Sequence, residues 1–194
     1  MAAAGVVVSL GHTDCAASVA QQAMAAGARC ATHLFNAMSQ LGNRDPGMVG
    51  AVLSSDLAAG LIADGHHVAI ATLRIALAAR PSGLFLVSDC MAAAGSDLTE
   101  FMLGGRRILR RDGRLTLEDG TLAGADLTLP RAVQVLVQDV GIAPERALAM
   151  ASSIPAAVIG RGDLGHLRPG ARADLVHLGP DLALRGVWRG GAAI

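Results

Sequence analysis

Short apolar runs alternate with longer segments of mixed polarity along the first ninety residues. The apolar runs lie at residues 6–9, 29–32, 57–63 and 84–88, and their length predicts buried strands. Helices are predicted at residues 14–26, 48–54 and 68–79. Thr13 or Asp14 is the expected N-cap of the first helix, Gly27 is its stop, and Pro81 closes the third. Continuous apolar strands separated by helices indicate an α/β fold with a parallel sheet covered on both faces.

The pattern changes after Asp89. Glycine and Asp-Gly turns separate short extended pieces near residues 98–120, which predicts a β-hairpin excursion. Helices are predicted again at residues 127–140, 144–151 and 155–159, and extended segments at 173–178 and 184–188. The chain contains no tandem repeat and no low-complexity linker.

A histidine or an aspartate follows each of the first four predicted strands. These residues are His12, His33, Asp64 and Asp89. In a (β/α) barrel the carboxyl ends of the strands share one mouth, and catalytic groups come from several of them. One such histidine alone would more often be a core residue bonded to a backbone carbonyl, and Asp64 could instead cap the helix that follows it. The coincidence of all four positions favours a site.

The two histidines at successive strand ends suit a divalent metal ion. His12 and His33 are 21 residues apart, which is one strand–helix–strand step and not a zinc-finger spacing. Neutral imidazole nitrogens bind zinc or iron well. Asp89, at the end of a later strand, could take a proton from a metal-activated water and then return it.

Other polar residues are weaker candidates. Arg44 lies in the loop "NAMSQLGNRDPG", where its guanidinium suits a phosphate or a carboxylate, although it could also be a surface arginine paired with Asp45. Of the adjacent His66 and His67, one is expected to face the mouth. The two histidines of the tail, at positions 166 and 177, are expected to be structural.

Composition narrows the class of protein. The 194 residues carry a formal net charge of +0, which gives no electrostatic indication of a nucleic-acid or membrane partner. The three cysteines, Cys15, Cys30 and Cys90, form no CxxC pair, which fits a reducing cytoplasm. No apolar run reaches the length of a membrane span, and the N-terminal residues lack the basic start of a signal peptide.

Several motifs resemble those of the N-acetylglucosamine-6-phosphate deacetylases, a family of the amidohydrolase superfamily. The motifs, in chain order, are "GHTDC", "THLFNAMSQLGNRDPG", "IADGHHV", "LVSDCMAAAG", "DGTLAGADLTL" and "LGHLRPGARADLVHL". The resemblance implies a partial (β/α)8 TIM-type barrel of a metal-dependent hydrolase over residues 1–165. Residues 166–194 would then be the C-terminal strands of a small β-sandwich. It also implies a cytoplasmic enzyme that hydrolyses N-acetylglucosamine 6-phosphate to glucosamine 6-phosphate and acetate.

The resemblance also implies roles for individual residues. His12 and His33 would bind the metal, zinc or iron, and Asp89 would be the general acid/base. The expected substrate-binding residues include Asp64 at the mouth, and the full set is Asn36, Ala37, Arg44, Asp64, His67, Leu122, Ala123 and Gly124. In this family the arginine can reach the phosphate across a homodimer interface, and Leu122 to Gly124 match a loop that closes on the sugar.

The chain matches only the C-terminal half of that family. The missing half supplies the first barrel strands, a glutamate metal ligand and a histidine that polarises the acetyl carbonyl. We therefore expect residues 1–194 alone to have little or no deacetylase activity. Two alternatives stay open: a related N-deacetylase, for example one acting on the galactosamine epimer, and a non-catalytic fragment that binds a sugar phosphate.

Overall fold

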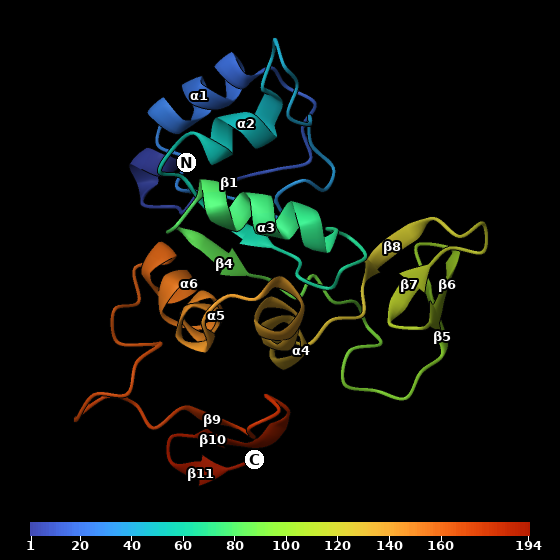
Figure 1. Cartoon of the computed structure of the whole chain (residues 1–194), viewed down its shortest axis with the longest axis vertical. Helices are drawn as coiled ribbons and strands as arrows, with labels where there is room; N and C mark the ends of the chain where they lie inside the picture. The colour runs from blue at the N-terminus through green and yellow to red at the C-terminus, as the bar shows by residue number, and fades with distance from the viewer.

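A four-stranded parallel sheet forms the centre of the computed structural model, which describes residues 1–194 (Figure 1). Its strands are β1 (Ser9–Leu10), β2 (Cys30–Ala31), β3 (Ala58–Leu61) and β4 (Leu84–Leu86), and they lie side by side in chain order. All three strand pairings are parallel. The predicted parallel sheet is therefore confirmed, with strands shorter than the apolar runs.

Helices connect the strands and follow them. After the short 3₁₀ helix η1 (Ala2–Ala4), they are α1 (Ala17–Ala25), α2 (Gly47–Leu53), α3 (Ile70–Ala79), α4 (Leu129–Gln134), the π-helix η2 (Val135–Val140), α5 (Pro144–Ala151) and α6 (Ser153–Val158). Figure 1 shows α1 and α2 together at one end of the molecule, α3 against the sheet, and α5 and α6 beyond β4.

Helix α1 begins later than the sequence predicts. Its N-cap is Ala16, and neither Thr13 nor Asp14 caps it. The backbone N–H of Ala17 donates instead to Oδ1 of Asp45, at 3.0 Å. Thr13 extends the chain beyond β1, where its N–H donates to the Ala37 carbonyl. The cap comes from a distant loop, so the local sequence could not reveal it.

The helices cover one face of the sheet, so the prediction that both faces are covered is wrong. The side chains that share the main core with the helices are Ala31, Ala59, Leu61, Leu84 and Leu86. Residues of the opposite face lie outside that core: Ser9 is exposed, and Ala58 and Phe85 are half-buried. Right-handed crossovers between strands that follow one another in a single direction place every helix on the same side.

An antiparallel sheet follows β4 and projects to the side of the helical layer (Figure 1). Its strands are β5 (Glu100–Leu103), β6 (Arg106–Arg111), β7 (Arg114–Thr116) and β8 (Leu122–Ala125). It has its own small core of Ala93, Ile108 and Leu115. This sheet occupies the region of the hairpin excursion expected near residues 98–120, and it extends to residue 125.

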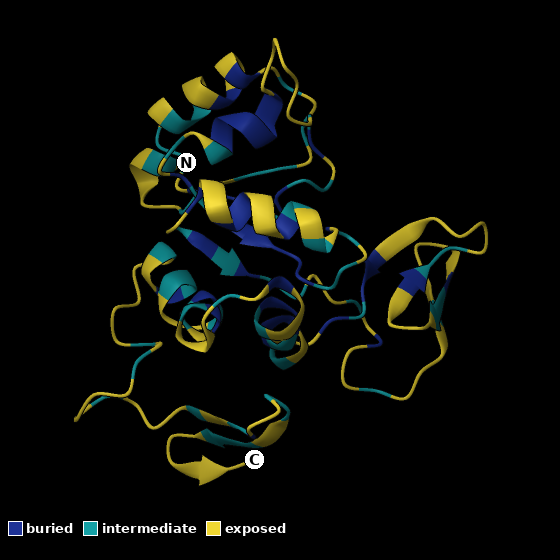
Figure 2. Cartoon of the chain, viewed as in Figure 1, coloured by how far each residue is buried: buried dark blue, intermediate teal, exposed yellow.

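The C-terminal residues form a third, largely exposed sheet (Figure 2). It consists of β9 (Leu175–Leu178), β10 (Leu184–Arg189) and β11 (Ala192–Ala193), all antiparallel. Gln134 and Gln138 donate to the carbonyl of Asp181 and connect this sheet to the helices. None of the helices combines the length and the hydrophobicity that a membrane-spanning helix requires.

Candidate active site

Two imidazole rings meet beyond the ends of β1 and β2. His12 follows β1 and His33 follows β2, so the parallel pairing brings both residues to one edge of the sheet. Nε2 of His12 lies 3.0 Å from Nε2 of His33. The ring centroids are 4.8 Å apart in an edge-to-face arrangement. The structure thus brings together the two residues predicted to bind a metal.

A backbone carbonyl fixes the orientation of the His33 ring. Nδ1 of His33 lies 3.2 Å from the carbonyl oxygen of Asn36. Because a carbonyl only accepts, Nδ1 is the donor of this bond, and Nε2 is the nitrogen left for a metal ion or another partner. Phe35 and Ala37, on either side of Asn36, have positive φ angles of 79° and 49°. This tight turn folds the loop back so that the Asn36 carbonyl reaches the ring.

The close approach of the two strand ends requires a glycine before His12. A Cβ at Gly11 would overlap the hydroxyl of Thr32 and would lie 3.1 Å from Thr32 Cβ. Thr32 directly precedes His33, so a side chain at Gly11 would push the two histidines apart. The short distance between His12 and His33 therefore depends on glycine at position 11.

The His12–His33 pair fits two corners of a zinc or iron site. Metal–nitrogen bonds of about 2.0–2.1 Å can span two nitrogens that are 3.0 Å apart. Elsewhere the side chains do not complete such a site: no group of three His, Cys, Asp or Glu residues in the chain could hold a metal ion. Catalytic zinc sites commonly use three protein ligands, and His12 and His33 could supply two of them.

Asp64 and His67 form a second pair, in the turn after β3. Oδ2 of Asp64 lies 2.6 Å from Nδ1 of His67, and Oδ1 accepts the backbone N–H groups of His66 and His67. Burial alone would raise the pKa of Asp64, but these hydrogen bonds, chiefly the one from the His67 side chain, hold it below its ordinary value. Asp64 does not cap the following helix, whose N-cap is Ala69.

Asp89 stands beyond the end of β4 with an exposed side chain. Its φ angle is 47°, close to the 46° of His12, and its carbonyl accepts the N–H of Ala125 at 3.1 Å. Non-glycine residues with positive φ are uncommon and occur often at functional sites. Since β4 runs parallel to β1 and β2, Asp89 lies at the same edge of the sheet as the two histidines.

The loop that carries Arg44 is held by its neighbour and by Ser39. Oδ1 of Asp45 accepts the N–H groups of Ala17 and Gly47, and these two bonds, in that order, lower the pKa of Asp45. Ser39 Oγ accepts the N–H of Met48 at 2.8 Å. Arg44 takes part in none of the ion pairs of the chain, so the alternative that it pairs with Asp45 is wrong.

A hollow of about 400 Å³ lies beside the His12–His33 pair. Its lining consists of His12, Thr13, Asp14, Ala37 and Met38. Ala37, an expected substrate-binding residue, therefore borders the pair, and its carbonyl accepts the N–H of Thr13. The side chain of Asn36, by contrast, donates to the carbonyl of Leu34 within its own loop.

Leu122, Ala123 and Gly124 belong to β8 rather than to a loop. Gly124 is buried, and a Cβ there would lie 2.6 Å from Cγ and Sδ of Met91. Leu122 and Ala123 are exposed. A strand paired with β7 holds these residues, so the expectation of a loop is wrong in its local structure.

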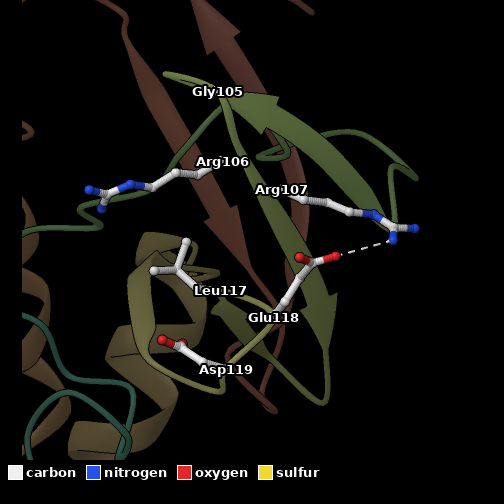
Figure 3. A pocket seen from close by; sticks show the side chains of 6 residues that line it. All are labelled: Gly105, Arg106, Arg107, Leu117, Glu118 and Asp119. Atoms are coloured by element: carbon white, nitrogen blue, oxygen red, sulfur yellow. Dashed lines mark hydrogen bonds and ion pairs between the residues drawn. The ribbon is translucent and has the colours of Figure 1, made fainter.

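A second hollow, of about 370 Å³, lies on the antiparallel sheet (Figure 3). Arg107 donates to Glu118, which also lines the hollow, and to Glu100, which lies outside the lining. It contains no histidine or cysteine, and we assign it no role in the site. The tail histidines are also remote in structure: His166 Nε2 contacts the Gly162 carbonyl, and His177 lies in β9.

Sequence reasoning missed the groups that hold the site residues in place. The Asn36 carbonyl orients His33, and the Asp45 carboxylate ties the Arg44 loop to the start of α1. A backbone carbonyl leaves no signal in a sequence. The Asp-Pro-Gly turn does leave one, because aspartate in such turns often accepts backbone N–H groups.

Comparison with known proteins places the chain in a family. The model of the amidohydrolase family matches residues 1–194. An N-acetylgalactosamine-6-phosphate deacetylase of Shewanella sp. (strain ANA-3) is 37% identical over 98% of this chain and 49% of its own length. An N-acetylglucosamine-6-phosphate deacetylase of Haemophilus influenzae is 37% identical over 94% and 49%, respectively.

Solved structures of deacetylases are also similar to this chain. The crystal structure of N-acetylglucosamine-6-phosphate deacetylase from Pasteurella multocida superposes with a TM-score of 0.94 at 40% identity, over 98% of this chain and 51% of that one. The Mycobacterium smegmatis enzyme gives 0.90 at 34% identity, with 53% of its chain covered. The chain thus spans about half the length of the relatives it matches. On the match over its full length, this chain belongs to the amidohydrolase family.

Proposed function

We propose that this chain carries part of the active site of a metal-dependent deacetylase that hydrolyses N-acetylglucosamine 6-phosphate to glucosamine 6-phosphate and acetate. The His12–His33 pair, with its Nε2 atoms 3.0 Å apart, is the observation that carries the proposal. Support comes from the names of the similar proteins, which are deacetylases of amino-sugar phosphates. The parallel sheet would be half of an eight-stranded barrel, and β9–β11 part of a small sandwich.

His12 and His33 would hold a zinc or iron ion through Nε2. Such an ion lowers the pKa of a water molecule and polarises the amide carbonyl. The hydrogen bond from His33 Nδ1 to Asn36 keeps the His33 ring aimed at that position. The chain itself contributes two ligands, so tight binding needs further donors.

Asp89 would move the proton. Its carboxylate accepts a proton from the water whose oxygen adds to the acetyl carbon. It then returns that proton to the amine nitrogen as the carbon–nitrogen bond breaks, which yields the amine and acetic acid, and the acid releases its remaining proton to give acetate. Support for this role comes from the exposure of the carboxylate and from its position at the same sheet edge as the two histidines.

The sugar phosphate would bind along the loops that follow β2 and β3. Arg44, which has no ion-pair partner in the chain, is free to pair with the phosphate. Asn36, Ala37 and His67 would contact the ligand, with Asp64 beside them, and β8 would border the sugar through Leu122, Ala123 and Gly124. We also propose a homodimer in the complete protein and a cytoplasmic location, which the three free cysteines favour.

A hybrid enzyme tests the proposal. Residues 1–194 replace the matching half of the Pasteurella multocida deacetylase, and acetate release from N-acetylglucosamine 6-phosphate is measured with zinc or iron. We expect turnover in the hybrid. The Asp89→Asn variant should lower kcat on the order of a hundredfold or more while substrate binding is retained.

The same assay decides between the alternatives. N-acetylgalactosamine 6-phosphate is tested in parallel, because one similar protein bears the name of that activity. A higher kcat/KM for the galactosamine epimer would replace the proposed substrate. A folded hybrid that binds the sugar phosphate without turnover would favour the non-catalytic alternative.

A further inference from the structure

Both oxygens of the Asp64 carboxylate accept hydrogen bonds from the protein. Its side chain is only 6% exposed. Oδ1 accepts the backbone N–H groups of His66 and His67, each at 2.8 Å, and Oδ2 accepts from Nδ1 of His67 at 2.6 Å. With three protein donors around it, this buried carboxylate has little access to a ligand. Asp64 therefore differs from a residue that contacts substrate directly.

The same contacts define the state of the His67 ring. The pKa of Asp64 is held below its ordinary value, so the carboxylate is ionised at neutral pH and can only accept. Nδ1 of His67 must then carry a proton, and the ring is fixed with Nδ1 inward. The His67 side chain is 10% exposed. Ring rotation would leave the buried carboxylate without its donor, which is costly.

The other ring nitrogen is free. Nε2 of His67 has no hydrogen-bond partner in the chain. The only completely buried side-chain nitrogen or oxygen that lacks a partner is Nδ1 of His166, so Nε2 of His67 is not completely buried. Nε2 is therefore at least partly accessible from outside the chain. The turn that carries it follows β3, between the strands that precede His33 and Asp89.

We infer that Asp64 is a positioning residue, which fixes His67 in the Nδ1–H form so that Nε2 is the atom presented to the bound sugar phosphate. The identity of that ligand rests on the proposed function. Asp64 acts through His67 and contributes no ligand contact of its own. Carboxylate–imidazole pairs of this kind set ring orientation and tautomer at many sites.

A spectroscopic test uses the chain as it is. Two-bond ¹⁵N–¹H correlation spectra distinguish the two tautomers of a neutral imidazole, and they are recorded at about pH 8.5, well above the ordinary histidine pKa of about 6.5. The His67→Gln variant assigns the signals. We expect a single Nδ1–H form for His67, a mixture of forms in Asp64→Ala, and no change in Asp56→Ala, a control at an exposed aspartate before β3.

Two results would overturn the inference. One is an Nε2–H form or a mixture in the unaltered chain, which decides the matter even if Asp64→Ala does not fold. The other is an unchanged Nδ1–H form in Asp64→Ala. Neither depends on catalysis, so a hybrid enzyme without turnover would refute the proposed function and leave the positioning role standing.

Kinetics of the hybrid enzyme supply a second test. Asp64→Ala should raise KM about tenfold with little change in kcat, as His67→Ala does, because one ligand hydrogen bond is lost. In the His67→Ala background, Asp64→Ala should have no further effect. Additive losses in the double variant would show that Asp64 acts independently of His67.

Discussion

The substitution Leu34→Ala should lower the free energy of unfolding more than the same substitution at any exposed leucine. Leu34 directly follows His33, its side chain is 0% exposed, and its N–H donates to the Gly60 carbonyl of β3 at 2.8 Å. The substitution removes three buried carbons, worth about 0.8 kcal/mol each, or about 2.4 kcal/mol in transfer free energy. The cavity left behind adds to this, and the expected total is about 3–4 kcal/mol.

Urea denaturation followed by circular dichroism measures this loss. In thermal unfolding of a chain of this length, each kcal/mol of lost stability lowers Tm by roughly 2–4 °C. Leu41→Ala is the matched control, because Leu41 is in the same loop and is 60% exposed. The control should change the free energy of unfolding by no more than about 0.5 kcal/mol. If Leu34→Ala lowers the free energy of unfolding no more than Leu41→Ala does, the burial of Leu34 does not stabilise the loop that carries His33.

Three further predictions concern the site. In the hybrid enzyme, Arg44→Ala should cost roughly 2–4 kcal/mol in kcat/KM for the phosphorylated substrate and little for the unphosphorylated sugar, and equal losses would make Arg44 structural. In the same enzyme, Gly11→Ala should reduce bound metal measured by mass spectrometry, as His33→Ala does, because it separates the two histidines; unchanged metal content would contradict this. In the chain itself, the pKa of Asp64 is lower in the folded state than the unfolded value of about 3.9, so its ionised form stabilises the fold above that pH. This stability is lost as pH falls through the folded pKa. The urea midpoint of Asp64→Asn should therefore decrease less below about pH 4 than the midpoint of the unaltered chain.

The parallel sheet was predictable because most residues of β2, β3 and β4 are buried, so that these strands appear in the sequence as apolar runs. Local sequence did not predict the hydrogen-bond partners that come from distant parts of the chain. Helix α1 illustrates this, since Asp45 accepts the N–H of Ala17 across 28 residues, and the apparent local caps Thr13 and Asp14 are not used. The uncovered face of the sheet was missed for a similar reason. A strand sequence gives the burial of its residues and does not reveal on which side the crossovers pass.

For the candidate site, residue types at strand ends identified His12, His33 and Asp89 as the groups to place at one edge of the sheet. Their orientation could not be read in this way. The Asn36 carbonyl reaches His33 only because Phe35 and Ala37 adopt positive φ angles, which their residue types disfavour. These angles follow from the packing of the loop, not from local preference.

Hydrogen bonds within the chain orient the residues of the candidate site, but the chain offers only two side chains for the proposed metal ion. His33 is oriented by Asn36, His67 by Asp64, and the Arg44 loop by Asp45. Outer contacts of this kind ordinarily tune a metal or substrate site whose inner ligands are already in place. Here they hold two histidines that lack a third partner within the chain. Metal affinity should therefore be limited by the number of ligands rather than by their orientation, and a single added donor at the His12–His33 pair should raise affinity without rebuilding the loops.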